Sequence, residues 1–301
     1  MQDDAIVLRY EFLSGGKPIV YPLMGPGGVS MTRDFPMSPA GEGDSKDHVH
    51  QRSLWMTHGE VNGIDFWMEG DKAGRIQHDR VVSHDVTARQ AKLVTTAKWV
   101  TPDDQVLLQE SRTMTVKGDE SLRTIEFAID LTAVDQPVHF GDTKEGSFGV
   151  RVADSMTVDK KLGGTIVNEH GEKDGEAWGK RARWVDYSGP IKRENGKRSP
   201  GKGDTGEGDT GKGDTVGIAI LEHPSSFGHP CRWHVRSYGL FAANPFGEFH
   251  FTGGKPTAGH TLAPGKTLHL QYMVLLHAGQ ANTELIEAQW KQFAGQSAAT
   301  R

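Results

Sequence analysis

The sequence predicts an all-β fold: a large antiparallel β-sandwich with one short helix near the C-terminus. Apolar and polar residues alternate with a period of two over many short stretches, which is typical of half-buried strands. The chain contains 38 glycines and 14 prolines, and turns rich in these residues separate the stretches. Because β-sandwiches commonly exceed about 200 residues, we expect the 301 residues to form a single domain, 1–301.

The expected strands and turns follow one another along the chain. Asn-Gly at positions 62 and 63 is a strong hairpin signal, so a tight turn should join two short extended pieces within residues 58–67. A second turn is expected at 244–247. Strands are expected at 108–116, 125–132, 216–221 and 268–276. In two of them one face is clearly apolar: Ile125, Phe127, Ile129 and Leu131, and Leu268, Leu270, Tyr272, Val274 and Leu276.

Two segments depart from the strand pattern. Residues 196–215 form a low-complexity insert, GKRSPGKGDTGEGDTGKGDT, whose glycine and charge content predicts a flexible, solvated loop. Residues 283–293 have helical periodicity, with Ile286, Trp290 and Phe293 at i, i+4 and i+7 behind a capping Asn282 or Thr283. We expect this helix to pack over an end or edge of a sheet.

Composition narrows the class of protein. The net charge is −5 and no basic stripe is present, so a nucleic-acid partner is not expected. Cys231 is the only cysteine, which excludes an internal disulfide and a cysteine-based zinc site. No apolar run approaches the roughly 18 residues of a membrane helix, and the acidic N-terminus lacks a signal-peptide pattern. We expect a soluble protein, cytoplasmic as written, or periplasmic or secreted if the true start lies upstream.

Four segments are rich in side chains that carry chemistry rather than in plain hydrophobic periodicity. They are Asp47–Trp67, His139–Arg151, Arg181–Pro190 and His229–Gly247. If these segments converge in space, they form a pocket of His, Trp, Arg and carboxylate side chains. Such a pocket suits a polar, hydroxyl-bearing small molecule or oligosaccharide.

His48 and His50 are the first candidate site residues. In an extended strand, residues two apart face the same way, so both imidazoles could reach one ligand, and Arg52 would follow on that face. The pair could act in metal-free acid/base chemistry or hydrogen bonding. It could also begin a divalent metal site completed by His58, Glu60 or Asp65, or have only a structural role.

Glu145 is the leading general acid/base candidate, because it lies beside Lys144 and between glycine-containing steps that let a side chain protrude into a cleft. Alternation places His234 and Arg236 on one face of a strand, with Trp233 and Val235 on the other. We expect the remaining candidates to contact the substrate, although several also have ordinary structural explanations as turn, core or ion-pair residues. The full substrate-binding set is Arg52, His58, Asn62, Asp65, His78, Asp142, Lys144, Arg151, Trp184 and Arg236.

Several familiar motifs are absent from the sequence. It contains no His-Glu-x-x-His, no Gly-x-Ser-x-Gly elbow and no dinucleotide fingerprint. Gly265-Lys266-Thr267 is like the end of a P-loop, but His260 stands where that motif requires glycine. Nucleotide chemistry and serine hydrolysis are therefore not expected.

Six motifs, in order along the chain, resemble the soluble bacterial family labelled PmoA-like or "methane oxygenase PmoA". They are TRDFPM, DHVHQRSLWMTHGEVNGIDFW, GDTKEGSFGVRV, WVDYSGP, HPCRWHVRSYGLFAANPFG and YMVLLHAG, and the likeness extends from about Tyr21 to Gly279. The resemblance implies a sandwich similar to the galactose mutarotase-like supersandwich, which acts mainly on carbohydrates. A true methane monooxygenase subunit lies in the membrane, so methane oxidation is not expected here. Gln51 departs from the His-Pro-His-His-Arg-Ser pattern expected of the family, but leaves His48 and His50 intact.

The sequence therefore favours a carbohydrate-active enzyme of epimerase, hydrolase or lyase type. Glu145 and one of His48, His50 or His234 would form its acid/base pair. No cofactor is certain, and the possible one is a divalent metal. One alternative is a metal-dependent oxidoreductase that holds iron or copper through His48, His50 and a carboxylate. The other is a non-catalytic carbohydrate-binding module.

Overall fold

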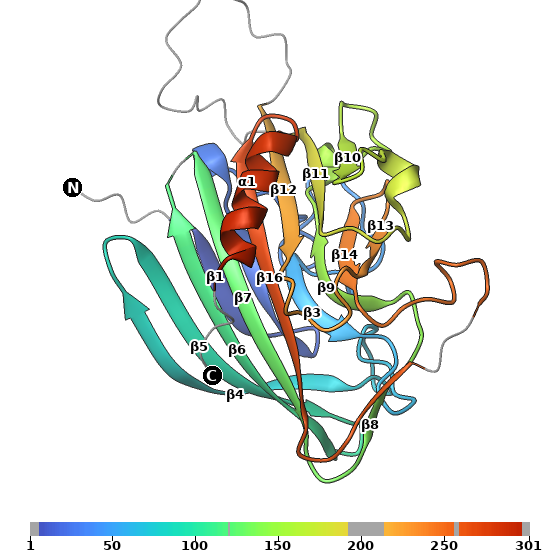
Figure 1. The fold of residues 1–301 in the computed structure, drawn as a ribbon. Coiled ribbons are helices and arrows are strands. Elements are labelled where there is room, and N and C mark those ends of the chain that lie inside the picture. The colour runs from blue at the N-terminus through green and yellow to red at the C-terminus, as the bar shows by residue number, and fades with distance from the viewer. Residues whose placement is uncertain (1–5, 120, 192–213, 256–258, 297–301) are drawn as a thin grey trace, which may run out of the picture.

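The computed structural model describes residues 6–119, 121–191, 214–255 and 259–296, and it confirms the predicted antiparallel β-sandwich (Figure 1). One sheet has six strands in the order β1 (Leu8–Ser14), β2 (Lys17–Leu23), β3 (Leu54–His58), β9 (Gly146–Arg151), β14 (Leu240–Asn244) and β13 (Arg232–Val235). The other has eight: β10 (Thr165–Asn168), β11 (Trp184–Pro190), β12 (Thr215–Glu222), β16 (Thr267–Ala278), β7 (Leu122–Ala133), β6 (Val106–Gly118), β5 (Gln90–Val100) and β4 (Arg75–Val86). A small ribbon pairs β15 (His260–Leu262) with β8 (Val138–Phe140).

The main core lies between the two sheets and draws residues from both. Phe148 of β9 packs edge-on against Phe127 of β7 at 5.0 Å between ring centroids, and stacks on Tyr272 of β16 at 4.7 Å. All three rings are almost completely buried. Burial of side chains of this size contributes about 1.5–3 kcal/mol each, so these contacts hold the sheets face to face.

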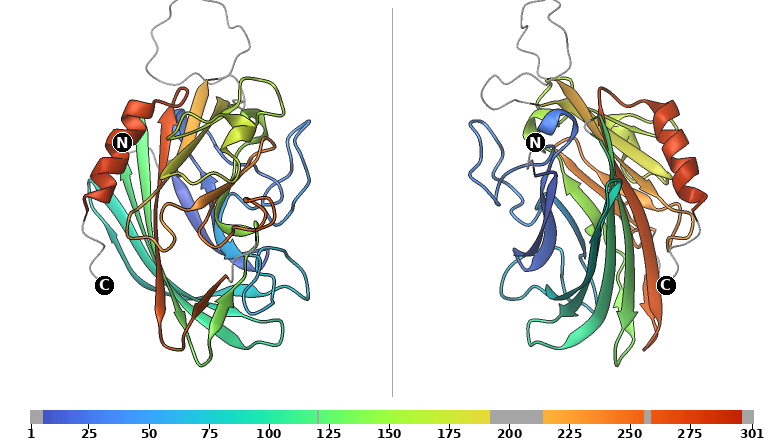
Figure 2. Two further views of the ribbon diagram at one scale, coloured as in Figure 1. Left: turned by 45° about the vertical axis from the view of Figure 1, so that its right-hand side comes forward. Right: turned by 90° about the vertical axis from the view of Figure 1, so that its left-hand side faces the viewer.

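The predicted strand faces are confirmed. Alternate residues of β7 and β16 point into the main core, as the alternation of Phe127, Ile129, Tyr272 and Val274 predicts. Helix α1 (Thr283–Ala294) covers the outer face of the eight-stranded sheet, where Ile286 and Phe293 pack on the other side of β16 (Figure 2). The middle of β16 is therefore buried on both sides.

Local signals at the helix and the hairpin also act as predicted. The Asn282 side chain accepts a hydrogen bond from the Leu285 backbone N–H at 3.0 Å and caps α1. Asn62 and Gly63 have φ values of 53° and 76°, and Val61 pairs with Ile64 across this turn. Three short 3-10 helices complete the described elements: Pro26–Gly28, Asp154–Met156 and Asp174–Ala177.

The segment from His48 to Arg52 is a turn rather than an extended strand: His48 has a left-handed backbone with φ 42°, and its carbonyl accepts a hydrogen bond from the Gln51 N–H at 2.9 Å. The expected strand geometry for His48 and His50 was therefore wrong. The insert at 196–215 lies almost entirely outside the described residues. Within the described part of the chain, no helix is long and apolar enough to span a membrane.

Candidate functional site

The outer face of the six-stranded sheet, turned away from the main core, carries most of the candidate residues. Strand register joins Trp55, Gly149, Ala242 and His234 in one row across β3, β9, β14 and β13. Trp233 lies in the main core beside this row, as does Val235, so the predicted alternation of β13 is confirmed. His234 consequently points to the outer face.

Two tryptophans cover the centre of this face. A Cβ at Gly149 would lie 3.0 Å from Cζ2 of Trp55, so the missing side chain lets the indole lie flat across the neighbouring strand. Trp67 packs on Trp55 at 5.3 Å, and His50 packs on Trp67 at 6.2 Å between ring centroids. Asp65 fixes this arrangement because its Oδ1 accepts hydrogen bonds from the backbone N–H groups of Trp67 (2.7 Å) and Met68 (2.9 Å).

Asp47 organises the side chains next to these rings. Its Oδ1 accepts hydrogen bonds from Arg33 Nη1 at 2.7 Å and Arg151 Nη2 at 3.0 Å, and both arginine side chains are buried. Burial tends to raise the pKa of the Asp47 carboxyl, but the hydrogen bond from Ser45 and the charge of Arg151 outweigh it and hold the pKa well below its usual range. Asp47 therefore stays ionised.

The second oxygen of Asp47 holds His48. His48 Nδ1 lies 2.7 Å from Asp47 Oδ2, and the imidazole stacks on Tyr238 at 5.1 Å with 6° between the planes. The His48 side chain is 41% exposed, so its Nε2 is the nitrogen left for a ligand. A left-handed backbone at a non-glycine residue costs roughly 1–3 kcal/mol and is concentrated at functional sites.

His50 lies beside the Asp47–His48 pair. The ring centroids of His48 and His50 are 5.8 Å apart, and the two rings make a T-shaped contact. Burial lowers the pKa of His50 to about 4, and the charges of Lys17, His48 and Arg33 add to the effect. The imidazole of His50 is therefore neutral at neutral pH. We call Arg33, Asp47, His48, His50, Trp67, Arg151, Arg236 and Tyr238 the outer-face cluster.

Gln51 and Arg236 complete the surroundings of Tyr238. Gln51 Oε1 accepts a hydrogen bond from Arg151 Nη1 at 2.6 Å, and Gln51 Nε2 lies 3.5 Å from the Tyr238 hydroxyl. The guanidinium of Arg151 lies 4.7 Å from the centre of the Tyr238 ring, and that of the exposed Arg236 lies 5.6 Å from it. Gln51 thus contacts both the arginine and the tyrosine of this group.

Arg52 belongs to a neighbouring ion-pair network. It holds Glu69 through two hydrogen bonds of 2.7 and 2.9 Å, and the almost fully buried Lys17 donates to the same carboxylate at 3.0 Å. Glu69 also lines a cavity of about 330 Å³ together with Arg75 and the turn at Gly15 and Gly16. Arg52 is thereby close to the outer-face cluster but already committed to a carboxylate.

A second group of candidates lies further along the same face. Burial lowers the pKa of His234 to about 3, and the charges of Lys144 and Arg236 reinforce the shift. Lys144 forms an ion pair with Glu145. Within the described residues, the Glu145 carboxylate makes no hydrogen bond or ion pair with a histidine, so the structure does not bring Glu145 together with His48 or His50.

Buried polar atoms without partners also gather on this face. The indole N–H groups of Trp55 and Trp67 and the hydroxyl of Thr57 are buried and make no hydrogen bond with the described residues. Buried polar groups normally find a partner, which here would be ordered water or a bound ligand. This part of the face is therefore suited to a polar occupant.

The other predicted contacts have structural partners elsewhere. The fully buried ring of His58 bonds the Gly141 carbonyl at 2.8 Å, and Asn62 accepts a hydrogen bond from the His139 N–H at 2.7 Å. Asp142 Oδ1 accepts hydrogen bonds from two backbone N–H groups at Glu248 and Phe249. None of these side chains joins the outer-face cluster.

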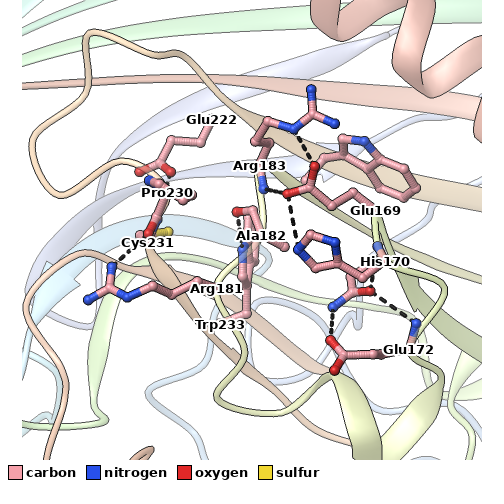
Figure 3. Close-up of polar contacts among 12 residues, drawn as sticks. Glu169, His170, Glu172, Arg181, Ala182, Arg183, Glu222, Pro230, Cys231 and Trp233 are labelled. Atoms are coloured by element: carbon pink, nitrogen blue, oxygen red, sulfur yellow. Dashed lines mark hydrogen bonds and ion pairs between the residues drawn. The ribbon is translucent and has the colours of Figure 1, made fainter.

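His78 and Trp184 are also remote from the cluster. His78, on β4, stacks on Phe12 at 4.3 Å between ring centroids. Trp184 is buried beneath α1 and donates to Glu287 at 2.7 Å. Two arginines just before Trp184 in the chain bind different partners: Arg183 donates to Glu169, and Arg181 donates to the Pro230 carbonyl (Figure 3).

Sequence reasoning overlooked the roles of Lys17, Asp47, Glu69 and Tyr238. The sequence does not distinguish a lysine or glutamate that is buried in an ion pair from one on the surface, so it gives no signal for Lys17 or Glu69. Asp47 and Tyr238 did lie within the chemistry-rich segments. Within the described residues, no group of three or more His, Cys, Asp or Glu side chains is arranged to hold a metal ion.

Fold and site together define a two-sheet β-sandwich protein with a histidine, arginine and aromatic site on the outer face of its smaller sheet. The chain belongs to a family of unknown function, DUF6807, whose sequence profile matches residues 1–291. No curated protein matches the sequence.

Solved structures with a similar arrangement include the GH36 α-galactosidase AgaB from Geobacillus stearothermophilus (12% identity, TM-score 0.40) and the galactosidase domain of the α-galactosidase–sucrose kinase AgaSK (10%, 0.38). They cover 92% and 90% of this chain, which spans only 39% of either of those chains. A putative aldose 1-epimerase from Escherichia coli K12 is 10% identical, covers 90% of this chain over 100% of its own, and has a TM-score of 0.35.

Proposed function

We propose that the protein is a carbohydrate-active enzyme that transforms a sugar or glycoside by acid/base chemistry at the outer-face cluster. The observation that carries the proposal is the Asp47–His48 pair: an exposed imidazole, fixed by an ionised carboxylate that two buried arginines hold, beside aromatic side chains. We also propose that the chain is related to the PmoA-like family, because the fold expected of that family acts mainly on carbohydrates.

In the proposed mechanism, His48 moves the proton. Nδ1 donates to Asp47, so Nε2 is the basic nitrogen that faces the substrate and takes a proton from it. The ionised carboxylate stabilises the imidazolium that forms, because two buried arginines keep Asp47 from taking the proton itself. The imidazolium then returns the proton as a general acid.

The second group of the acid/base pair that this geometry favours is His50 rather than Glu145. His50 is neutral at neutral pH and its ring lies 5.8 Å from that of His48, whereas Glu145 is paired with Lys144. Arg236 is exposed beside Tyr238, where its planar fork can hold sugar hydroxyls.

The test compares wild-type protein with His48→Ala and with the control His84→Ala, an exposed histidine on β4. Each is incubated with free glucose and galactose, followed by NMR exchange between anomers, and with a panel of nitrophenyl glycosides. We expect His48→Ala to lose about 10²–10⁴-fold in turnover. His84→Ala should match wild type.

Three outcomes would overturn the proposal. Equal turnover by His48→Ala and wild type would remove the proton-transfer role. Saturable glycan binding by wild type without turnover on any panel member would favour a carbohydrate-binding module. Stoichiometric iron or copper in protein purified without a histidine tag, lost in His48→Ala, would favour the metal-dependent oxidoreductase.

A further inference from the structure

A second cavity lies at the edge of the six-stranded sheet, where the end of β14 meets the β8–β15 ribbon. Its volume is about 300 Å³, and its walls include Arg181, Phe227, Pro245, Phe246, Glu248 and His260. We call it the edge cavity. Ligand pockets begin at about this volume, which suits a single small ring rather than an extended molecule.

The walls of the edge cavity are largely aromatic. The rings of Phe227 and His260 lie 4.3 Å apart, and both are only partly buried. Phe246 lies behind them, 5.5 Å from Phe227, and is itself stacked on Phe140 at 4.6 Å. Strand pairing of His260 with Phe140 holds the set in place. A supported aromatic surface with exposed ring area is what stacks on the apolar face of a pyranose.

The polar walls carry charges that cancel. The two carboxylate oxygens of Glu248 pair with Arg181 and with Arg232, the latter at 2.8 Å, while Asp142 holds the Glu248 backbone N–H at 2.6 Å. Among the residues that line the cavity, the positive charge of Arg181 thus faces the negative charge of Glu248. Burial, reinforced by the charge of His139, lowers the pKa of His260, so that its ring is also neutral at neutral pH. Paired guanidinium and carboxylate groups offer donors and acceptors to hydroxyl groups without attracting an anion.

The edge cavity adjoins the proposed site along one strand. Arg232, which pairs with Glu248, precedes His234 by two residues on β13, or roughly 7 Å. Arg236, beside Tyr238 and His48, is a further two residues along the chain. None of His48, His50, Glu145 and His234 lines the cavity, so a ring bound there would not be the one that reacts.

We propose that the edge cavity binds one neutral pyranose unit of an oligosaccharide, whose reacting unit lies beyond the end of β13 at the outer-face cluster. This inference rests on the proposed function for the reacting unit, but the binding of a pyranose in the cavity does not. It makes the substrate an oligosaccharide rather than a free monosaccharide. Arg181, whose guanidinium donates to the Pro230 carbonyl in Figure 3, lines the cavity and would also bond hydroxyl groups of the bound unit.

The test uses methyl β-D-glucopyranoside and methyl β-D-galactopyranoside as probes and the ring protons of His260 as the NMR reporter. The expected result is a saturable shift of His260 on titration with one of the glycosides. Phe227→Ala should weaken this binding about tenfold, because it removes the stacking surface. Phe12→Ala is the matched control, since Phe12 also lies 4.3 Å from a histidine ring, that of His78 on β4, and should leave binding unchanged.

Two further comparisons keep the inference falsifiable. Arg181→Gln changes a half-exposed side chain and should also weaken binding without loss of fold. Sodium glucuronate should bind more weakly than the neutral glycosides. Absence of any His260 shift, binding unchanged in both Phe227→Ala and Arg181→Gln, or tighter binding of glucuronate would each overturn the inference.

The two proposals can fail separately. If His48→Ala abolishes turnover while no glycoside shifts His260, the edge cavity is not a sugar subsite and the proposed function stands. If glycosides shift His260 but His48→Ala has full activity, the proposed function fails, and the reacting unit does not lie where we place it.

Discussion

The ion pair between Asp186 and His277 should stabilise the fold in a pH-dependent way. His277 Nε2 lies 2.6 Å from Asp186 Oδ2, and the two side chains are 3% and 0% exposed. The pair joins β11 to β16 across β12, where Gly217 leaves room for the imidazole: a Cβ there would lie 2.3 Å from the ring. Burial alone would lower the pKa of His277, but the hydrogen bond and charge of Asp186 outweigh it and raise the pKa.

Replacement of Asp186 by asparagine removes the negative charge and keeps the shape. Removal of one partner from a buried pair costs about 3–5 kcal/mol, and since asparagine can still bond the imidazole, we expect about 3 kcal/mol. Asp130→Asn is the matched control: His269 Nδ1 lies 2.7 Å from Asp130 Oδ1, but the side chains are 17% and 37% exposed. Pairs open to solvent are worth about 1 kcal/mol or less.

Urea unfolding at about pH 6 and about pH 9 provides the measurement. Since the folded pKa of His277 lies above the unfolded value of 6.5, its stabilisation is fully present below about pH 6.5 and is lost as the pH rises through the folded pKa. The gap in unfolding free energy between wild type and Asp186→Asn should therefore be widest at the lower pH. A gap that widens with pH, or one no larger than that of Asp130→Asn, would refute the reasoning.

Three further predictions concern the outer-face cluster and the Trp55–Gly149 contact beside it. Arg151→Lys keeps the charge but loses the fork that reaches Asp47, and should cost about 2 kcal/mol in urea unfolding; an unchanged midpoint would contradict this. Gly149→Ala should displace the Trp55 indole, at a cost of about 1–3 kcal/mol, with a changed near-UV circular dichroism spectrum; an identical spectrum would argue against the close approach. His50 should titrate near pH 4 by NMR and, because its folded pKa is below the unfolded 6.5, should destabilise the fold as the pH falls between these values; a measured pKa near 6.5 would show that the ring is solvated.

Periodicity predicted the sheets well because each strand repeats its signal over many residues. The alternation of Phe127 and Ile129, and of Tyr272 and Val274, needs no knowledge of the partner strand to indicate a buried face. The cap at Asn282 is equally local. The order of the strands in each sheet is not a local property, because it depends on which strands pair after the chain has folded.

The candidate site was predicted in composition but not in geometry. The expectation for His48 and His50 assumed an extended backbone, whereas the left-handed turn at His48 brings the rings together in a different way. On sequence grounds Glu145 could be an acid/base group or simply the ion-pair partner of Lys144, and the structure shows the ion pair. From the sequence, Trp184 could be either a ligand-stacking residue or a core residue. In the structure it is a core residue because α1 packs over it.

The row that joins Trp55, Gly149, Ala242 and His234 links positions roughly 90 residues apart at each of two steps. Such distant pairings form slowly, because chain entropy must be lost before any contact compensates for it. On the ribosome, Trp55 would be synthesised long before the strand that carries His234. His48 would likewise be synthesised long before Tyr238, on which it stacks. Binding competence should thus appear late in folding, so a ligand of the outer face would report completed chains and ignore partly folded ones.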